Sequence, residues 1–392
     1  MSHLALRIIG TGSTLTKELC RAAREELPFP IEFEVLDGPS CMRRGVLRPD
    51  SYDVYDQWFY SLDVLWTAGA IQAIDTGRIR RWPEVRLAGQ MPGTAPSVSQ
   101  ASAPSAQLFV QRDGTLGEQP DAGGPPPIGM LPTTYNVDSF GYGRELLTEV
   151  DPNEVESWAW LLDDRWHGRC TLSLDPAGSA VELALAARAA GLVDVRDPGN
   201  LTIEEIDALF QVLLSLKRRG HFTRFWGTSE DSVALMAGAN AVIGSLWSPA
   251  YYALRGMGCD IVYAAPREGY RGWHSGLCLS SSVEGEKAEV AYAYLNWWLE
   301  GTPGAIMARQ GYYTSVVGTL RAALSQAEWD YWYEGKPATE DLPGPSSAIA
   351  VRRGETREGG NFLNRVGRIT VWSTVMPEHN YLARRWREFL EL

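Results

Sequence analysis

The sequence contains no apolar run of about 18 residues, so no segment is long enough to cross a bilayer as a helix. The apolar stretch from Leu4 to Ile9 has no basic region before it and no cleavage pattern after it. We therefore expect a first β-strand there rather than a signal peptide. The protein is expected either to be cytoplasmic or to have lost a leader, which would place it in the periplasm or outside the cell.

Cysteine and histidine are scarce, with five residues of each. The cysteines are scattered without a CxxC pair, and no two histidines have the i, i+4 spacing of a zinc-binding helix. We therefore expect no metal site and no other cofactor, and most cysteines should be small buried residues. The sequence also lacks a GKS or GKT phosphate loop and a Gly-x-Ser-x-Gly elbow, which argues against an enzyme.

Basic residues are outnumbered, which gives a net charge of −12 and a pI of about 5.0. Nucleic acids and anionic membranes bind basic surfaces, so neither is an expected partner. With 392 residues, of which 45% are hydrophobic, the chain is longer than one core usually serves. We therefore expect two lobes or domains.

Strand and helix patterns alternate in the first part of the chain, which predicts an α/β fold with parallel sheets flanked by helices. LALRIIG is strand-like and is followed by a helical pattern over 15–26. Residues 31–37 alternate as a strand should, and a further strand over 52–60 leads into a helix that ends near Gly69.

The pattern is lost between Gly89 and Met130, where Ser, Pro, Gly and Ala dominate. We expect a solvent-exposed loop or insertion there, with a functional lid as the alternative. Ordered patterns return beyond Met130. They include capping boxes at Ser179–Glu182 and Thr202–Glu205, strand-like runs over 239–247, 260–266 and 276–282, and a helix over 286–301.

Aromatic residues are abundant, with 15 tryptophans, 16 tyrosines and 10 phenylalanines. Several follow predicted strands, where ligands of open α/β sheets bind and where ring faces suit a cation. Packing in the core is the alternative for each of them. The loop Gly10–Thr14 could offer free N–H groups to an anion, or Ser13 or Thr14 could simply cap the following helix; the residues leave both interpretations open.

Four segments, in order, resemble the spermidine/putrescine-binding class of ABC-importer solute-binding proteins. The resemblance covers most of the chain outside 89–130 and the C-terminal end. The segments are YDVYDQWFYSLDVLWTAGAIQAID (Tyr52–Asp75), SWAWLLDDRWHGRCTLSLD (Ser157–Asp175), Gly238–Leu279 with its Trp and Glu-Gly-Tyr elements, and helix Glu286–Leu299 followed by Gly311-Tyr312.

The resemblance implies a type II periplasmic-binding-protein fold, in which each lobe is a mixed sheet flanked by helices and the ligand lies in the interlobe cleft. It implies crossings between lobes near 134–136 and 268–273. Residues 1–134 would form the first part of lobe 1, 135–270 would form lobe 2, and 271–392 would return to lobe 1 and end in a helical tail. A monomer that closes on its solute and then meets ABC membrane subunits is implied.

The resemblance also implies binding positions. Trp247 and Trp273 match aromatics that pack along a polyamine, and Asp175 matches an acidic residue that receives an amine. The family's further carboxylates are replaced here by Ser275 and Gly178. Because each ammonium needs a charge partner, a zwitterion, a mono-amine or a quaternary ammonium is expected instead of a polyamine. The predicted ligand contacts are Thr11, Ser13, Trp58, Tyr60, Asp175, Trp247, Trp273, Ser275 and Tyr313.

Two other functions remain open at this point, because a fold does not fix a function. An enzyme on the same fold would use Asp175, His274 and Glu268 as acid–base groups. A cytoplasmic ligand sensor that keeps the receptor fold is the other alternative, and the missing leader pattern motivates it.

Overall fold

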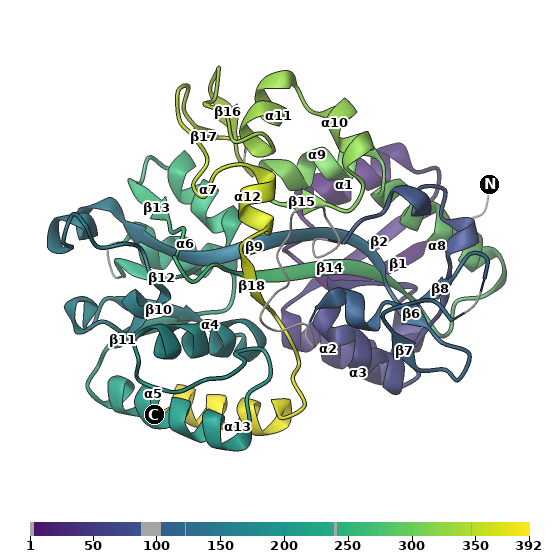
Figure 1. The fold of residues 1–392 in the computed structure, drawn as a ribbon. Helices are drawn as coiled ribbons and strands as arrows, with labels where there is room; N and C mark the ends of the chain where they lie inside the picture. Colours follow the sequence, from purple (N-terminus) through teal and green to yellow (C-terminus); the bar gives the residue numbers. More distant parts are fainter. Residues whose placement is uncertain (1–3, 88–102, 122, 239–240, 346) are drawn as a thin grey trace. The chain divides into compact units, whose positions relative to one another are not determined.

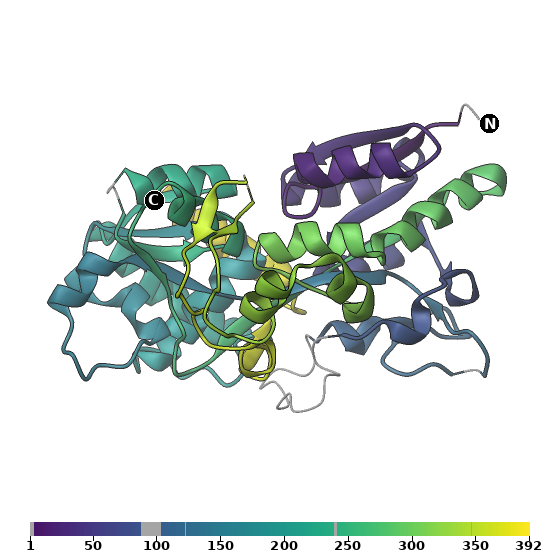
Figure 2. The same ribbon diagram turned by 90° about the horizontal axis from the view of Figure 1, so that it is seen from above.

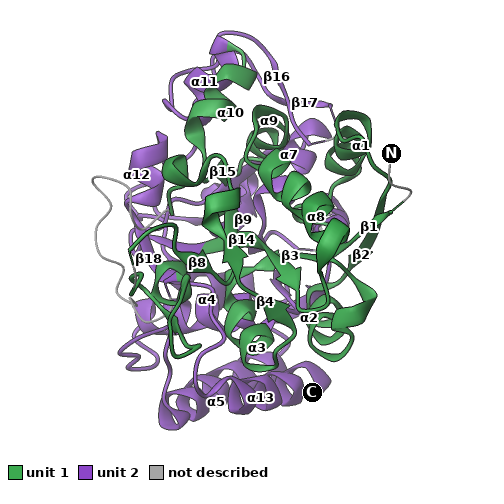
Figure 3. Ribbon diagram, turned by 90° about the vertical axis from the view of Figure 1, so that its right-hand side faces the viewer, with its two compact units in different colours: residues 1–92, 104–136, 273–325 green, residues 93–103, 137–272, 326–392 purple. Residues whose placement is uncertain are grey.

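The computed structural model describes residues 4–87, 103–121, 123–238, 241–345 and 347–392. The chain forms two compact units (Figure 3). Unit 1 comprises the described residues within 1–92, 104–136 and 273–325, and unit 2 those within 93–103, 137–272 and 326–392. Two long strands, β9 (Leu131–Gly143) and β14 (Tyr270–Ser280), each begin in one unit and end in the other.

Unit 1 is built on a parallel β-α-β-α-β segment, as the alternating pattern predicts. β1 (Leu6–Thr11) pairs in parallel with both β2 (Ile31–Leu36) and β3 (Val54–Trp58), and β14 pairs antiparallel to β3. Short strands β4 (Ile71–Gln72) and β15 (Tyr313–Thr314) pair with β14 and β9. The helices are α1 (Lys17–Glu26), α2 (Gly38–Leu47), α3 (Leu62–Thr67), α8 (Gly285–Trp298), α9 (Gly301–Arg309) and α10 (Val317–Ala323). Figures 1 and 2 show the purple helices of the first segment lying against its strands.

The described part of the segment expected to be a loop forms a small antiparallel sheet with β5 (Ile74–Asp75), a strand that precedes it. The strands of the segment itself are β8 (Pro127–Ile128), β6 (Phe109–Val110) and β7 (Leu116–Gly117). Strands of two residues are too short to produce an alternating pattern, which explains why the sequence did not predict them. Residues 88–102, and with them about a third of the expected loop or lid, lie outside the described residues.

Unit 2 has its own mixed sheet. β10 (Cys170–Ser173) pairs in parallel with β11 (Phe222–Trp226) and β12 (Ile243–Leu246), and β9 pairs antiparallel to β12 and to β13 (Ile261–Tyr263). The first residues of β14 pair in parallel with β18 (Ile369–Trp372). The helices of this part are α4 (Pro176–Ala189), α5 (Ile203–Arg218), α6 (Ser229–Ala237), α7 (Ser248–Gly256) and α13 (His379–Glu391).

The C-terminal segment 326–392 groups with unit 2, whereas we expected all of 271–392 to return to lobe 1. It contains α11 (Gln326–Trp332), β16 (Leu342–Pro343), β17 (Ile349–Val351), α12 (Phe362–Val366), β18 and α13. Two contacts explain the grouping. The pairing of β18 with β14 attaches it to the sheet, and Lys217 of α5 donates to the last carbonyls of α13, including that of Phe389 at 2.5 Å.

Each unit has its own hydrophobic core, made only of its own residues. In unit 1 the apolar faces of β1 and β3 pack against helices such as α1, whose buried side includes Leu19 and Ala23. In unit 2 the buried side of α5, with Leu209 and Leu213, packs in the core that also holds Trp386 of α13. Four of the five cysteines are buried, as expected.

The two expected capping boxes differ in outcome. Thr202 caps α5 with a complete box, since its hydroxyl accepts from the N–H of Glu205 and the Glu205 carboxylate accepts from the N–H of Thr202. The box at Ser179–Glu182 is wrong, because α4 begins earlier, with Asp175 as its N-cap. Pro176 fits the first helical position, where no N–H is needed, and this shifts the start of the helix.

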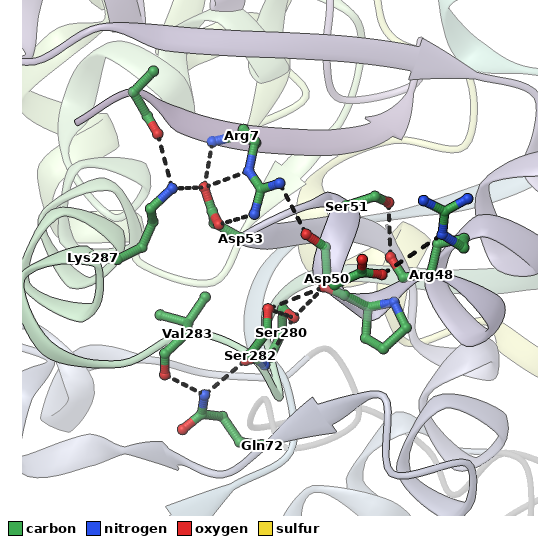
Figure 4. A network of polar contacts seen from close by, with 12 residues as sticks. Arg7, Arg48, Asp50, Ser51, Asp53, Gln72, Ser280, Ser282, Val283 and Lys287 are labelled. Carbon is green, nitrogen blue, oxygen red and sulfur yellow. Dashed lines mark hydrogen bonds and ion pairs between the residues drawn. The ribbon is translucent and has the colours of Figure 1, made fainter. Parts of the chain in front are cut away.

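At the amino ends of β1 and β3, a polar network ties unit 1 together (Figure 4). Asp53 accepts from the backbone N–H of Arg7 at 2.8 Å, from its guanidinium at 2.7 Å and from Lys287 of α8 at 3.1 Å. Burial by itself raises the pKa of Asp53, but these hydrogen bonds outweigh it and lower the pKa. The network satisfies a buried charge at the edge opposite to the strand ends where ligands of such sheets bind.

Candidate functional site

The carboxyl ends of β1, β2 and β3 lie at one edge of the unit 1 sheet because the three strands are parallel. β14 runs antiparallel to β3, and its register places Ser275 directly opposite Trp58. Four of the predicted residues therefore gather at this edge, which we call the unit 1 edge: Thr11, Ser13, Trp58 and Ser275. Open α/β sheets bind ligands at this kind of edge.

The loop that follows β1 is a tight turn that is closed by the backbone. The carbonyl of Thr11 accepts from the N–H of Thr14 at 3.3 Å and of Leu15 at 3.0 Å. Of the two interpretations left open for this loop, capping by Ser13 or Thr14 is wrong. Helix α1 starts after the turn with Thr16 as its N-cap, which accepts from the N–H of Leu19 at 3.1 Å. Thr11 is buried and Ser13 is half-buried.

Asp56, which the sequence analysis did not single out, lies beneath this loop. Its carboxylate is completely buried and accepts a hydrogen bond from the hydroxyl of Thr14 at 2.9 Å. Burial raises the pKa of Asp56 to about 7, and the hydrogen bond from Thr14 offsets only part of that effect. The close approach of the strands requires Gly10, since a Cβ there would lie 2.6 Å from the Asp56 carbonyl oxygen.

Trp58 and Tyr60 present an aromatic surface at the unit 1 edge. Their rings are stacked, with centroids 5.5 Å apart and an interplanar angle of 23°, and both side chains are half-buried. Gly38, at the start of α2, makes room for the indole, because a Cβ there would lie 2.6 Å from Trp58 Cζ3. A half-exposed ring pair of this kind can pack against a cation or an apolar stem.

Three other predicted residues are buried in unit 1. Trp273 belongs to the hydrophobic core, and its ring meets Tyr312 edge-on with centroids 5.0 Å apart. The Ser275 hydroxyl donates to the carbonyl of Gln57 at 3.0 Å. Tyr313 lies in β15, with its ring centroid 5.8 Å from that of Tyr135. Within unit 1 these side chains support the edge, and Trp58 and Tyr60 are its more accessible aromatics.

The candidate acid–base groups of the enzyme alternative have other partners. His274 is enclosed by the rings of Phe59 and Tyr135, and its Nδ1 lies 2.9 Å from the carbonyl of Ser275. Burial lowers the pKa of His274 to about 4, so the ring is neutral at pH 7. In unit 2, Glu268 accepts from the hydroxyl of Ser157 at 2.6 Å and from a backbone N–H.

Unit 2 offers a second edge of the same kind, at the carboxyl ends of β10, β11 and β12. Asp175 follows β10 and accepts from the N–H of Ala177 at 3.1 Å, and Trp247 follows β12. Both side chains are half-buried. Because β10 and β12 pair in parallel as neighbours, these two predicted residues share one edge, which we call the unit 2 edge.

Trp226 at the end of β11 is an aromatic of this edge that the sequence analysis missed. Its ring meets that of Trp247 edge-on, with centroids 4.8 Å apart and an interplanar angle of 83°. It is buried, and among the described residues its indole N–H has no hydrogen-bond partner. Its position as the last residue of a parallel strand was the signal that could have identified it.

A buried ion-pair cluster lies behind the unit 2 edge. Arg271 donates through Nε to Glu182 at 2.9 Å, through one terminal nitrogen to Asp138 at 3.0 Å and through the other to Ser373 at 2.5 Å. Glu182 also accepts a short hydrogen bond from Ser245. Burial alone would lower the pKa of Arg271, but the charges of the two carboxylates raise it.

The cluster explains the wrong capping box, since Glu182 forms an ion pair instead of capping a helix. The sequence did contain a signal for it. Glu182 stands alone in an Ala, Val and Leu run, and Arg271 stands in a strand whose residues are otherwise neutral. Isolated charges of opposite sign in two apolar segments are expected to pair when both segments are buried.

The described residues were also considered as membrane-spanning helices and as metal ligands. None of the helices there is both long and apolar enough to span a membrane. In the same ranges, no group of three or more His, Cys, Asp or Glu side chains could hold a metal ion. The arrangement therefore consists of aromatic rings, hydroxyls and one accessible predicted carboxylate at two sheet edges, which suits binding.

Comparison with known proteins gives the following findings. A family model described as bacterial extracellular solute-binding protein matches residues 87–331. The comparison with curated proteins finds no match. Among solved structures, a putative spermidine/putrescine ABC transporter from Listeria monocytogenes is 12% identical with a TM-score of 0.68, covering 99% of each chain.

Two further solved structures are similar along their whole length. The spermidine/putrescine ABC transporter substrate-binding protein PotD from Streptococcus pneumoniae is 14% identical with a TM-score of 0.62, covering 98% of this chain and 99% of that one. The PBP MotA from A. tumefaciens, in complex with glucopine, is 10% identical with a TM-score of 0.62 and the same coverage. The expected two-lobed α/β fold of periplasmic binding proteins is thus confirmed.

Proposed function

Because the chain belongs to the family of bacterial extracellular solute-binding proteins, we propose that it is the solute receptor of an ABC-type importer. It acts as a monomer in the periplasm or outside the cell and delivers its solute to the membrane subunits of the importer. The observation that carries the proposal is the position of the predicted residues at the carboxyl edges of both sheets, where this fold class binds ligands.

The ligand class follows from the chemistry of those edges. Asp175 provides a carboxylate for an amine, and Trp247, which packs against the buried Trp226, provides an aromatic ring beside it on the neighbouring strand. At the unit 1 edge, the stacked pair of Trp58 and Tyr60 provides ring faces. We propose a small solute with a single cationic group, either a mono-amine, a quaternary ammonium or a zwitterion.

Binding without chemical change is supported by the state of the candidate acid–base groups. His274 is neutral and enclosed, and its Nδ1 is directed to a backbone carbonyl. Glu268 is held by Ser157 and by the N–H of Trp158. Neither group is poised for proton transfer, so the proposal predicts that the solute is released unchanged.

A thermal-shift screen over amines, amino acids, betaines, phosphonates and sulfonates tests the proposal. A true ligand stabilises the folded protein by RT ln(1 + [L]/Kd), which is about 2.7 kcal/mol at a hundredfold excess over Kd. Trp247→Ala should remove most of the shift, whereas Trp329→Ala, which truncates another half-buried tryptophan of unit 2, should keep it. A flat screen over all these classes, or turnover of the bound compound, would contradict the proposal.

A further inference from the structure

Three charged side chains of unit 2 are almost completely removed from water. Arg271 is 4% exposed, Asp138 is 3% exposed and Glu182 is 2% exposed. A buried carboxylate is tolerated only with a counter-charge and hydrogen bonds, so two of them close together need a cation between them. Arg271 satisfies both with separate nitrogens of one planar group.

The guanidinium lies beside the carboxylate that we assign to the ligand. At Gly178, in the first turn of α4, a Cβ would lie 3.5 Å from Asp175 Oδ2 and 3.7 Å from Arg271 Cζ. Both groups therefore flank the same small space.

Asp138 lies at the unit 2 edge, and Glu182 lies behind it. In the antiparallel pairing of β9 with β12, Ser139 lies opposite Leu246, the last residue of β12. Asp138, one residue before Ser139, therefore lies level with the carboxyl ends of the strands. Glu182 lies on α4, two helical turns after its N-cap Asp175. A chain with these two acids and no arginine would present a strongly anionic subsite next to Asp175.

We propose that Arg271 is a specificity-determining residue that occupies this subsite as a built-in cation. Asp138 and Glu182 are thereby neutralised, and Asp175 is left to receive the amine of a ligand. A second ammonium group would lose its water shell without gaining a counter-charge, and it would be repelled by the guanidinium. Polyamines are rejected for this reason. The choice of ligand rests on the proposed function, while the existence of the internal cation subsite does not.

The first experiment removes the built-in cation and supplies a free one. Arg271→Met should lower the melting temperature strongly, and millimolar methylguanidinium should restore a large part of the loss by entering the vacated space. Tetramethylammonium at equal ionic strength, which cannot donate hydrogen bonds, should not. Arg165→Met is the matched control, because Arg165 is also held by two carboxylates, those of Glu154 and Asp163, but is 31% exposed.

The outcomes of this experiment are decisive in either direction. Selective recovery of Arg271→Met by methylguanidinium, with no effect on Arg165→Met, supports an internal cation subsite. Should Arg271→Met not fold in buffer, it is refolded with methylguanidinium, and recovery again supports the subsite. The charge-free variant R271M/D138N/E182Q should fold, and methylguanidinium should not change its melting temperature. If only this variant folds and methylguanidinium never rescues R271M, the subsite is disproved.

The second experiment measures selectivity by calorimetric titration with n-butylamine, γ-aminobutyrate and putrescine. The native protein should bind putrescine at least about tenfold more weakly than the better of the other two, and Arg271→Met should gain at least about tenfold for putrescine. Equal or tighter binding of putrescine or spermidine by the native protein would overturn the proposal. If the native protein bound no solute in any screen, the proposed function would fail, while rescue by methylguanidinium would still stand.

Discussion

At the scale of single residues, unit 1 holds two buried titratable side chains, Asp56 and His274, whose pKa values shift in opposite directions. Burial raises the pKa of Asp56 to about 7 and lowers that of His274 to about 4, because it disfavours the charged form of each. Asp56 supports the loop after β1 through Thr14, and His274 adjoins Ser275 on β14. Asp56 is therefore mostly neutral below about pH 7, and His274 is mostly neutral above about pH 4. Both supports of the unit 1 edge are neutral between these two values.

Asp56→Asn is expected to stabilise the protein in mild alkali. The folded pKa of Asp56, about 7, is above its ordinary value of 3.8, so its contribution is fully present below pH 3.8 and is lost as pH rises through about 7. The shift corresponds to at most about 4 kcal/mol. Chemical denaturation at pH 5 and pH 8 should show a smaller loss for Asp56→Asn than for the native protein. Equal losses would contradict the account, and exposed Asp113→Asn serves as the control.

His274→Gln is expected to act on the acid side. The folded pKa of His274, about 4, is below its ordinary value of 6.5, so its contribution is present above pH 6.5 and is lost as pH falls toward 4. The native protein should lose up to about 3 kcal/mol of stability from this group over that range. Unfolding curves at pH 7 and pH 4.5 should show a shallower decline for His274→Gln. A decline unchanged by this variant, or reproduced by exposed His167→Gln, would be the contrary result.

At the scale of secondary-structure elements, local patterns in the sequence gave correct predictions where the element forms its own contacts. The box at Thr202 involves only its own first turn, and it is present as expected. The supposed box at Ser179 fails because Glu182 pairs with Arg271, which is far away in the sequence. Both segments have the pattern of a hydroxyl residue followed three positions later by a glutamate, so only the long-range partner distinguishes them.

For the candidate site, too, the sequence predicted the residues that local patterns mark and missed those that depend on long-range contacts. The residues that follow the predicted strands indicated Trp58, Tyr60 and Trp247, and the family resemblance indicated Asp175. All four lie at sheet edges. The buried supports of these edges, Asp56 and Arg271, were missed because burial and ion pairing depend on which elements meet. Trp273 and Tyr313 have the same residue types as the accessible aromatics, and only the fold reveals their burial.

The close packing of β1 and β3 is expected to depend on Gly10. A Cβ at this position would lie 2.6 Å from a backbone oxygen and 2.8 Å from Leu15, so Gly10→Ala should cost about 1–3 kcal/mol and displace the loop. Gly12→Ala, where the nearest atom is 3.9 Å away, is the matched control in the same loop. Denaturant midpoints and ligand affinity compare the two. Similar values for both variants would refute the role given to Gly10.

At the scale of the whole molecule, two units with separate cores were foreseeable from chain length and from the resemblance of four segments. The assignment of residues 326–392 was not, because it depends on β18 pairing with the first residues of β14 and on α13 packing against α5. Neither strand pairing nor helix packing between such distant segments leaves a local pattern in the sequence.

Lobe closure on the solute is a hypothesis from the sequence that small-angle scattering can test. Saturation with a ligand found in the thermal-shift screen should reduce the radius of gyration of the protein, and Trp247→Ala should need a higher ligand concentration for the same change. An unchanged scattering profile at saturating ligand would contradict closure while leaving binding itself intact.

The central claim is that this protein binds one small solute through residues at the carboxyl edges of its two sheets. Calorimetric titration of the best ligand from the screen tests this claim most directly. We predict one site per chain, with at least about tenfold weaker binding for Asp175→Asn in unit 2 and for Trp58→Ala in unit 1. Binding that either substitution leaves unchanged, or a stoichiometry other than one, would contradict the account.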